Sequence, residues 1–209
     1  MMTEVQQLKT GTTTVGIICK DGVVLGAEKK ATMGYLIDSK VARKVYQLDN
    51  HVGMTIAGSV GDAMAIVRLM RAQLKLYKLE RGPMTLKAAA ALLENILQGN
   101  KFYPYMNMFI LGGFDVNGPQ IWSLDPVGGG SNLDKYYSTG SGSPYAYGAL
   151  EAEYSENMTV AEGAALALRA IKVAIERDIG SGGRGFTIAL ITKDGYRELT
   201  DNEIKSYSK

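Results

Sequence analysis

Short apolar runs, each bounded by polar or glycine-containing turns, make up much of the chain and predict β-strands. The pairs Asp21-Gly22, Asn117-Gly118 and Asp194-Gly195 each separate two such runs. Tight hairpin turns favour Asp-Gly and Asn-Gly, so neighbouring runs should pair as antiparallel strands. The predicted strands span residues 13–19, 23–27, 44–48, 52–57, 106–111, 120–124, 135–138, 187–192 and 196–199.

Longer segments in which apolar residues recur at helical spacing, or which open with a capping signal, predict α-helices. A Gly82-Pro83 pair should end the first of them. The Gly128-Gly129-Gly130 run, which lies between the predicted strands 120–124 and 135–138, is expected to be a loop. The predicted helices, with the residues expected to cap them, are 63–80 (Asp62), 86–99 (Thr85), 144–154 (Ser143), 160–174 (Thr159 and Glu162) and 201–206.

The order of these elements predicts the architecture. Four strands precede two helices, then come three strands, two helices, two strands and a short last helix. This order lacks regular βαβ alternation, which argues against a parallel sheet. Because strands as apolar as 23–27 must be covered on both faces, two sheets should pack face to face with helices outside. We therefore expect one α+β domain, a four-layer αββα sandwich of two antiparallel sheets flanked by helices.

Composition limits the classes of partner and the cellular compartment that are expected for the protein. The chain has 209 residues and a formal net charge of +2, without a basic patch interleaved with aromatic residues, so no nucleic-acid partner is expected. No apolar stretch reaches the roughly 18 residues of a membrane span. Residues 1–10 lack the apolar centre of a signal peptide and form a short polar leader. These features favour a cytoplasmic protein without a membrane partner.

The single cysteine, Cys19, and the single histidine, His51, limit the chemistry. A disulfide within the chain and a zinc site of the usual Cys/His type are both excluded, and we expect no metal. Cys19 should be a small buried residue, and His51 a solvated turn residue. A Ser-His-Asp triad would need His51, and no G-x-S-x-G elbow occurs. The loop that starts at Gly140 has Tyr145 where a dinucleotide loop needs its third glycine, so no cofactor is expected.

The run Gly11-Thr12-Thr13-Thr14-Val15-Gly16 offers a nucleophile that brings its own base. If the bond between Gly11 and Thr12 is cut, Thr12 becomes an N-terminus with a hydroxyl and a free amine. The pKa of such an amine is roughly 7.7–8.0, so it can accept the hydroxyl proton near neutral pH. The same residues also fit ordinary threonines of an edge strand, since threonine is common in strands.

An N-terminal nucleophile needs three supports. A nearby cation must favour loss of the hydroxyl proton and keep the amine neutral. A carboxylate must hold that cation, and a backbone N–H must stabilise the developing oxyanion.

Motifs along nearly the whole chain, from residue 11 to about 199, resemble proteasome β subunits of the archaeal catalytic type. The resemblance rests on separate segments, so it is more specific than any one of them. The segments are Gly11-Thr12-Thr13-Thr14-Val15-Gly16, Glu28, Ala42-Arg43-Lys44-Val45, Ala57-Gly58-Ser59-Val60-Gly61-Asp62, Ser138-Thr139-Gly140-Ser141-Gly142-Ser143 and Arg177-Asp178-Ile179-Gly180-Ser181-Gly182-Gly183.

The resemblance implies the N-terminal nucleophile hydrolase fold and a threonine endopeptidase. In this family's scheme Thr12 is the nucleophile, Lys44 paired with Glu28 lowers its pKa, and the Gly58 N–H stabilises the oxyanion. Ser141, Asp178 and Ser181 would hold the Thr12 amine and a bridging water. Residues 12–209 would form the mature domain and residues 1–11 a propeptide, removed by self-cleavage between Gly11 and Thr12.

The resemblance also implies a specificity pocket and partners. The pocket residues would all be apolar, so a chymotrypsin-like preference is expected; they are Ala31, Ala42, Ile56, Val60 and Met64. Partners would be β subunits in a seven-membered ring, stacked α rings, unfolded protein substrates and, indirectly, a regulatory ATPase.

Plainer interpretations of the same residues stay open. Glu28 and Lys44 would fit a surface ion pair, which contributes little to stability. Ser141 and Ser181 would fit loop or capping hydroxyls, and Asp178 a helix-end residue, although the helix dipole disfavours Asp there. At the level of the whole chain the alternatives are an inactive ring subunit, the bacterial ATP-dependent threonine peptidase with the same sandwich, and a chaperone-like binding module.

Overall fold

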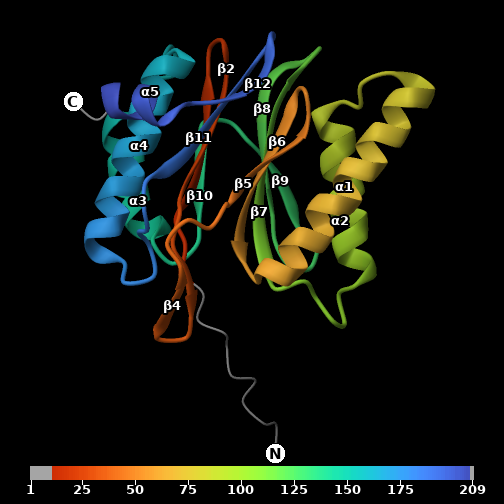
Figure 1. Ribbon diagram of the computed structural model, residues 1–209. Helices are drawn as coiled ribbons and strands as arrows, with labels where there is room; N and C mark the ends of the chain where they lie inside the picture. The colour runs from red at the N-terminus through yellow and green to blue at the C-terminus, as the bar shows by residue number, and fades with distance from the viewer. Residues whose placement is uncertain (1–10, 208–209) are drawn as a thin grey trace, which may run out of the picture.

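Two five-stranded sheets lie face to face between two layers of helices in the computed structural model, which describes residues 11–207 (Figure 1). Every strand pairing is antiparallel. The predicted four-layer αββα sandwich is therefore confirmed. The leader, residues 1–10, lies outside the described residues.

The first sheet has the strand order β10-β1-β2-β11-β12. Its central strand β2 is buried at every position, which explains why the sequence there is apolar without alternation. The strands are β1 (Thr14–Cys19), β2 (Gly22–Glu28), β10 (Tyr136–Thr139), β11 (Phe186–Thr192) and β12 (Gly195–Glu198).

The second sheet runs β5-β6-β7-β8-β9 in chain order. Its edge strand β9 begins at Gly130, where the glycine run predicts only a loop. Strand pairing with β8 orders residues whose own sequence gives no strand signal. The strands are β5 (Val45–Asp49), β6 (Val52–Gly58), β7 (Asn107–Asp115), β8 (Gly118–Leu124) and β9 (Gly130–Leu133).

Helices cover the outer face of each sheet and so create three apolar layers. In Figure 1 the helices α3 and α4 pack on the first sheet, and α1 and α2 pack on the second. Between the sheets lies a third cluster that includes Leu25, Ile110 and Ile191. The helices are α1 (Val60–Arg81), α2 (Leu86–Gly99), α3 (Ser143–Glu153), α4 (Val160–Arg177) and α5 (Asp201–Ser206).

The helix caps agree with the sequence at two of four predicted starts. Thr85 caps α2, and Thr159 forms the predicted capping box of α4. The cap of α1 is Ser59 rather than Asp62, whose carboxylate instead accepts a hydrogen bond from the Met106 N–H at 3.0 Å.

At α3 the prediction of Ser143 as the cap is wrong, because Ser143 is already helical and Gly142 is the N-cap. A side chain at Gly142 would lie 2.0 Å from Thr13 Oγ1, so the close approach of the chain to β1 leaves room only for glycine.

The single cysteine and the single histidine are both largely enclosed. Cys19 is 1 % exposed, which confirms the prediction for it. The expectation of a solvated His51 is wrong: its ring is mostly buried, with Nε2 2.8 Å from the Met84 carbonyl oxygen. The connection before α2 folds back over the β5–β6 turn and covers the imidazole, a contact that local sequence does not encode.

A two-stranded hairpin, β3 (Ala31–Met33) and β4 (Leu36–Ser39), projects from the sandwich beyond the sheets (Figure 1). Ala31 pairs with Ser39 and Thr32 with Ile37, so Asp38 is the extra residue of a β-bulge. The sequence predicts no strand here, because the apolar residues of the hairpin do not alternate with polar ones. In the structure most of these apolar side chains are exposed.

Candidate active site

Thr12 lies just before β1, which sits between β10 and β2 inside the first sheet. Thr12, Thr13 and Thr14 are 4 %, 0 % and 0 % exposed. An edge strand would leave such side chains in solvent on one side, so the edge-strand interpretation of the threonine run does not hold. The hydroxyls instead bind other buried polar groups.

Lys44 reaches the Thr12 hydroxyl from the second sheet. It precedes β5, and its Nζ lies 2.9 Å from Thr12 Oγ1. The same ammonium forms an ion pair with Glu28, the last residue of β2. Glu28 is 0 % and Lys44 6 % exposed, so this is a buried pair and not the surface pair that the residues alone allowed.

The Glu28 carboxylate accepts three further hydrogen bonds, all from backbone N–H groups. The donors are Thr13 at 3.2 Å, Lys30 at 2.6 Å and Gly182 at 3.1 Å. A buried carboxylate with this many partners is held in one position. Glu28 therefore fixes the place of Lys44 relative to Thr12.

Burial shifts the pKa of Glu28 and the pKa of Lys44 in the directions that favour their neutral forms. The charge of each residue opposes the shift of the other. Loss of solvent raises the pKa of Glu28, against the attraction of Lys44 and the hydrogen bonds that it accepts. Loss of solvent lowers the pKa of Lys44, against the attraction of Glu28 and, more weakly, of Asp178. The lysine is thus a cation that gives up its proton more readily than a solvated one.

A second network approaches Thr12 from its backbone nitrogen. Asp178 Oδ2 accepts hydrogen bonds from Ser141 Oγ at 2.7 Å and from Ser181 Oγ at 2.6 Å. Ser141 Oγ in turn accepts from the Thr12 N–H at 3.2 Å, and Ser181 Oγ lies 2.6 Å from Thr13 Oγ1. The two serines therefore do more than cap a loop, and Asp178, the C-cap of α4, connects to the Thr12 nitrogen through one hydroxyl.

Gly11 is held between the two networks. Thr12 Oγ1 donates to the Gly11 carbonyl oxygen at 2.6 Å, and Lys44 Nζ donates to the same oxygen at 3.3 Å. A Cβ on Gly11 would lie 2.0 Å from Gly180 Cα, so the backbones touch and only glycine fits. The carbonyl of the bond that precedes Thr12 is thus fixed beside the hydroxyl and the ammonium.

A cavity of 260 Å³ opens beside Thr12 and Lys44. Four of the five predicted pocket residues line it: Ala31, Ala42, Ile56 and Val60. Met64 does not, because it lies a turn further along α1 and packs against the core beneath that helix.

Gly58 also lines the cavity. Its φ of +141° and the Met106 carbonyl oxygen, which lies 2.0 Å from where a Cβ would be, exclude any other residue.

The cavity is less uniformly apolar than the sequence predicts. Asp38 from the hairpin, together with Arg43 and Tyr46, completes part of its wall. Asp38 belongs to a hairpin that the sequence does not predict, whereas Arg43 and Tyr46 lie in or beside the predicted strand 44–48 and were not among the expected pocket residues.

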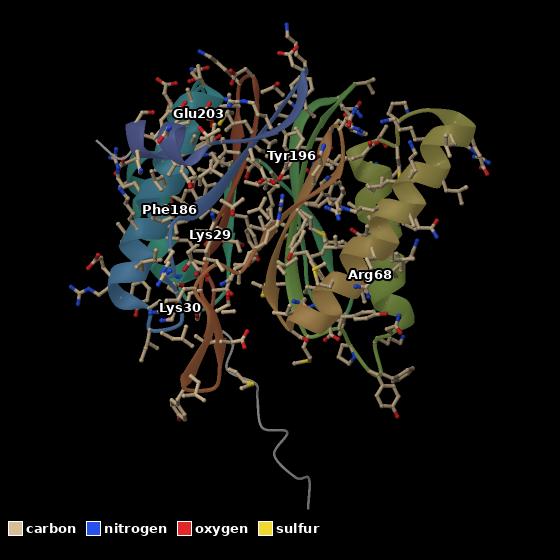
Figure 2. All side chains as sticks on the ribbon, viewed as in Figure 1. Lys29, Lys30, Arg68, Phe186, Tyr196 and Glu203 are labelled. Carbon is tan, nitrogen blue, oxygen red and sulfur yellow. The ribbon has the colours of Figure 1, made fainter. Side chains whose placement is uncertain are left out.

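Three further residues touch the site and were not expected there. Thr13 bridges the two networks, and the Thr32 hydroxyl accepts from the Gly11 N–H at 3.0 Å. Lys30, labelled in Figure 2 at the base of the hairpin, donates from Nζ to the Ile179 carbonyl oxygen at 2.6 Å. The only sequence signals for them are the threonine run and the charged pair Lys29-Lys30, neither of which specifies a contact.

Within residues 11–207, no three His, Cys, Asp or Glu side chains gather in a group that would hold a metal ion. No helix among those residues is both long and apolar enough to cross a membrane. The chemistry available at Thr12 is that of a hydroxyl, a buried ammonium, a hydrogen-bonded carboxylate and backbone N–H groups. Such a set suits attack of the hydroxyl on a carbonyl carbon.

Comparison with known proteins places the chain in one family. The family model for proteasome subunits matches residues 8–191. The proteasome subunit beta of Methanosarcina mazei is 51% identical over 197 residues, 94% of this chain and 93% of the relative. That of Methanococcoides burtonii is 53% identical over 190 residues, 90% of each chain, and that of Methanocaldococcus vulcanius 51% identical over 196 residues, 93% and 87%. The buried Thr12 site thus lies in a chain that belongs to the proteasome subunit family.

Proposed function

We propose that the chain is a threonine endopeptidase subunit of a 20S proteasome core, with Thr12 as its nucleophile. One observation carries the proposal: Lys44 Nζ lies 2.9 Å from Thr12 Oγ1, while the Thr12 nitrogen contacts Ser141, which is bound to Asp178. A cation on the oxygen side and a proton path on the nitrogen side of one residue are what an N-terminal nucleophile requires.

Peptide hydrolysis follows from these positions. Thr12 Oγ forms a bond to the substrate carbonyl carbon, and its proton passes to the Thr12 amine, directly or through a water held by Ser141, Asp178 and Ser181. Gly58 N–H and Lys44 stabilise the negative charge on the carbonyl oxygen. The C–N bond then breaks, the amine gives its proton to the leaving nitrogen, and water hydrolyses the ester that remains on Thr12.

Activation is proposed to be self-cleavage between Gly11 and Thr12. While residue 11 is attached, the Thr12 nitrogen is an amide and cannot act as a base. Thr12 Oγ would attack the Gly11 carbonyl carbon, and the C–N bond between Gly11 and Thr12 would break. The proton of the Thr12 hydroxyl would move to the Thr12 nitrogen, and water would then hydrolyse the ester. Support comes from the Gly11 carbonyl oxygen, which accepts hydrogen bonds from both Thr12 Oγ1 and Lys44.

Cleavage is expected after apolar residues, a chymotrypsin-like preference. Ala31, Ala42 and Ile56 leave an apolar space next to Thr12, which favours Leu, Phe or Tyr before the cut bond. Peptides that end in each residue type before a fluorescent leaving group measure this preference. Faster cleavage after Arg or Asp would refute it.

The proposed assembly is that of relatives named proteasome subunit beta. The chain would form a heptameric β ring, stacked with α-subunit rings, that degrades unfolded proteins in the cytoplasm, with an ATPase acting indirectly by unfolding the substrates. Metal and cofactor have no part in this scheme.

Intact-mass measurement tests nucleophile and activation together. The assembled wild-type protein should lose residues 1–11 and cleave an apolar reporter peptide, whereas Thr12→Ala should keep its leader and be inactive. Thr14→Ala, which alters a neighbouring buried hydroxyl of the same run, is the matched control and should still be processed. Equal masses for wild type and Thr12→Ala at full activity would refute the proposal.

A further inference from the structure

Asn107, the first residue of β7, carries a buried carboxamide that no other group satisfies. The residue is 1 % exposed. Neither its Nδ2 nor its Oδ1 has a hydrogen-bond partner among residues 11–207. Burying an unpaired amide costs free energy, and most buried polar side-chain atoms in proteins are paired. An apolar side chain would fill the same space without that cost, so the polar atoms themselves need an explanation.

Strand register places this carboxamide directly opposite Gly58, the last residue of β6. The Ser59 N–H donates to the Met106 carbonyl oxygen at 2.9 Å, so Gly58 and Asn107 form a pair of the kind that exchanges no hydrogen bonds. Facing side chains lie closest in such pairs. Because Gly58 has no side chain, Asn107 fills the space: a Cβ on Gly58 would lie 2.9 Å from Asn107 Nδ2.

The same register turns the backbone N–H of Gly58 toward the site. In a pair without mutual hydrogen bonds, each backbone N–H points away from the partner strand, here away from β7. On the other side of β6, strand β5 begins at Val45 opposite Thr55 and stops short of Gly58. Gly58 lines the cavity beside Thr12, so its N–H is left facing that cavity.

The backbone next to Asn107 is held from two sides. Met106 donates from its N–H to Asp62 at 3.0 Å and accepts from the Ser59 N–H through its carbonyl. These bonds keep Asn107 in register with Gly58. A dipole that is fixed in advance stabilises developing charge without the cost of reorganisation, which is the property that catalysis of acyl transfer requires.

We propose that Asn107 is a positioning residue of the oxyanion site: the amino end of its carboxamide, packed against Gly58, strengthens the interaction of the Gly58 N–H with the negative charge of the tetrahedral intermediate. The amino group is the positive end of the amide dipole, and it lies behind the glycine whose N–H faces that charge. Asn107 acts through Gly58 and touches no substrate atom. The inference rests on the proposed peptidase function and adds to it a residue that lies outside all of the sequence motifs.

Two apolar variants of the assembled protein test this role. Asn107→Leu removes the carboxamide at nearly constant volume, and Asn107→Val removes it with a smaller side chain that suits a strand. In both, kcat for a reporter peptide with Leu before the cut bond should fall about three- to tenfold at unchanged KM. The loss should stay below the roughly 10²–10³-fold that removal of a direct oxyanion donor causes. Asn107→Leu should resist urea at least as well as wild type, because it leaves no group unpaired.

Trp122→Phe is the matched control. Trp122 Nε1 is likewise a buried side-chain nitrogen without a hydrogen-bond partner in the described part of the chain. It belongs to β8 of the same sheet, where it is paired with Leu111, and it does not line the cavity. Its removal should leave kcat at the wild-type value.

A peptide aldehyde isolates the oxyanion step from substrate binding. Thr12 Oγ forms a bond to the aldehyde carbon, the hydroxyl proton passes to the Thr12 amine, and the former carbonyl oxygen takes the negative charge. The corresponding peptide alcohol binds the same cavity but cannot react. Asn107→Leu should weaken inhibition by the aldehyde about three- to tenfold and leave inhibition by the alcohol unchanged. Equal weakening of both inhibitors would show that Asn107 only shapes the cavity, and would overturn the inference.

The two proposals fail in different ways. If wild type hydrolyses the peptide while both Asn107 variants keep its kcat and its full preference for aldehyde over alcohol, the Asn107 inference is overturned and the peptidase proposal stands. If wild type does not hydrolyse the peptide and binds the aldehyde no more tightly than the alcohol, the peptidase proposal fails and the Asn107 inference fails with it.

Discussion

At the scale of residues, Lys44 and Glu28 are each stable in the core only because of the other. Removing one member of a buried ion pair leaves an uncompensated charge and destabilises by about 3–5 kcal/mol, whereas replacing both often has little effect. Comparing single with double replacement therefore separates the contribution of the ion pair to stability from the chemical role of Lys44 beside Thr12. Lys44 alone contacts the hydroxyl, and Glu28 acts on it through Lys44.

Lys44→Met should therefore be destabilised by about 3–5 kcal/mol and inactive. The double variant Lys44→Met/Glu28→Gln should recover most of that stability and stay inactive, because the cation beside Thr12 is still missing. Urea unfolding and reporter hydrolysis measure the two effects separately. Activity in the stable double variant would show that Lys44 has no chemical role.

The pH dependence of kcat/KM should be bell-shaped. On the acid side activity rises as the Thr12 amine loses its proton, a group whose pKa is ordinarily about 7.7–8.0. On the alkaline side activity falls as Lys44 loses its proton. Burial lowers the pKa of Lys44, so this fall should lie below the ordinary lysine value of about 10.4.

Glu28→Gln should move the alkaline fall to lower pH. The carboxylate raises the pKa of Lys44 by charge and by hydrogen bond, and the amide lacks the charge. The variant must first be shown to be folded by circular dichroism. An alkaline limb at the same pH in both proteins would mean that Lys44 does not control it.

The resemblance of separate short motifs predicted the residues that lie around Thr12, because each motif contains one of these residues. It was not enough for the cavity wall. Met64 falls outside because the helix turns its side chain to the core, and Asp38 enters because of a bulge. Both depend on backbone geometry that residue type does not specify.

At the scale of elements, local signals predicted those parts of the fold whose chemistry is local. The capping box at Thr159 and the Gly82 stop lie where they were expected, because both act within one helical turn. The β3–β4 hairpin and β9 were not predicted, because their order depends on pairing with other strands and not on an apolar pattern. Ser59 replaced Asp62 as a cap because a backbone N–H elsewhere in the chain binds the Asp62 carboxylate.

Two helical glycines provide a matched test of element packing. A Cβ on Gly163 of α4 would lie 2.5 Å from Cys19 Sγ on β1, whereas a Cβ on the exposed Gly148 of α3 meets nothing within 4 Å. Gly148→Ala should stabilise the chain by up to about 1 kcal/mol through helix propensity. Gly163→Ala should destabilise it by about 1–3 kcal/mol through overpacking.

Urea unfolding of the two variants at equal protein concentration measures this difference. If Gly163→Ala were as stabilising as Gly148→Ala, the close packing of α4 on β1 would be disproved.

The same contact predicts that Cys19 is unreactive. Burial raises the pKa of its thiol to about 12, so very little thiolate exists at neutral pH. A maleimide reagent should label Cys19 only after denaturant is added. Rapid labelling of the native protein would contradict the packing of this layer.

At the scale of the whole molecule, the site exists only where the two sheets and both helix layers end together. Thr12 and Glu28 come from the first sheet, Lys44 and Gly58 from the second, and Asp178 from the end of α4. No single element holds two complete supports of the nucleophile. If the bond at Gly11 is cut by Thr12 as proposed, the sandwich therefore has to form first.

The central claim is that oxygen and nitrogen of one residue, Thr12, act together, and a peptide epoxyketone tests it most directly. This reagent offers two electrophilic carbons, one for each atom. After treatment of the assembled protein, tandem mass spectrometry should locate a single adduct on a peptide that begins at Thr12, with both atoms modified and activity lost. Loss of activity with the adduct on any other residue, or with Thr12 unmodified, would contradict the account.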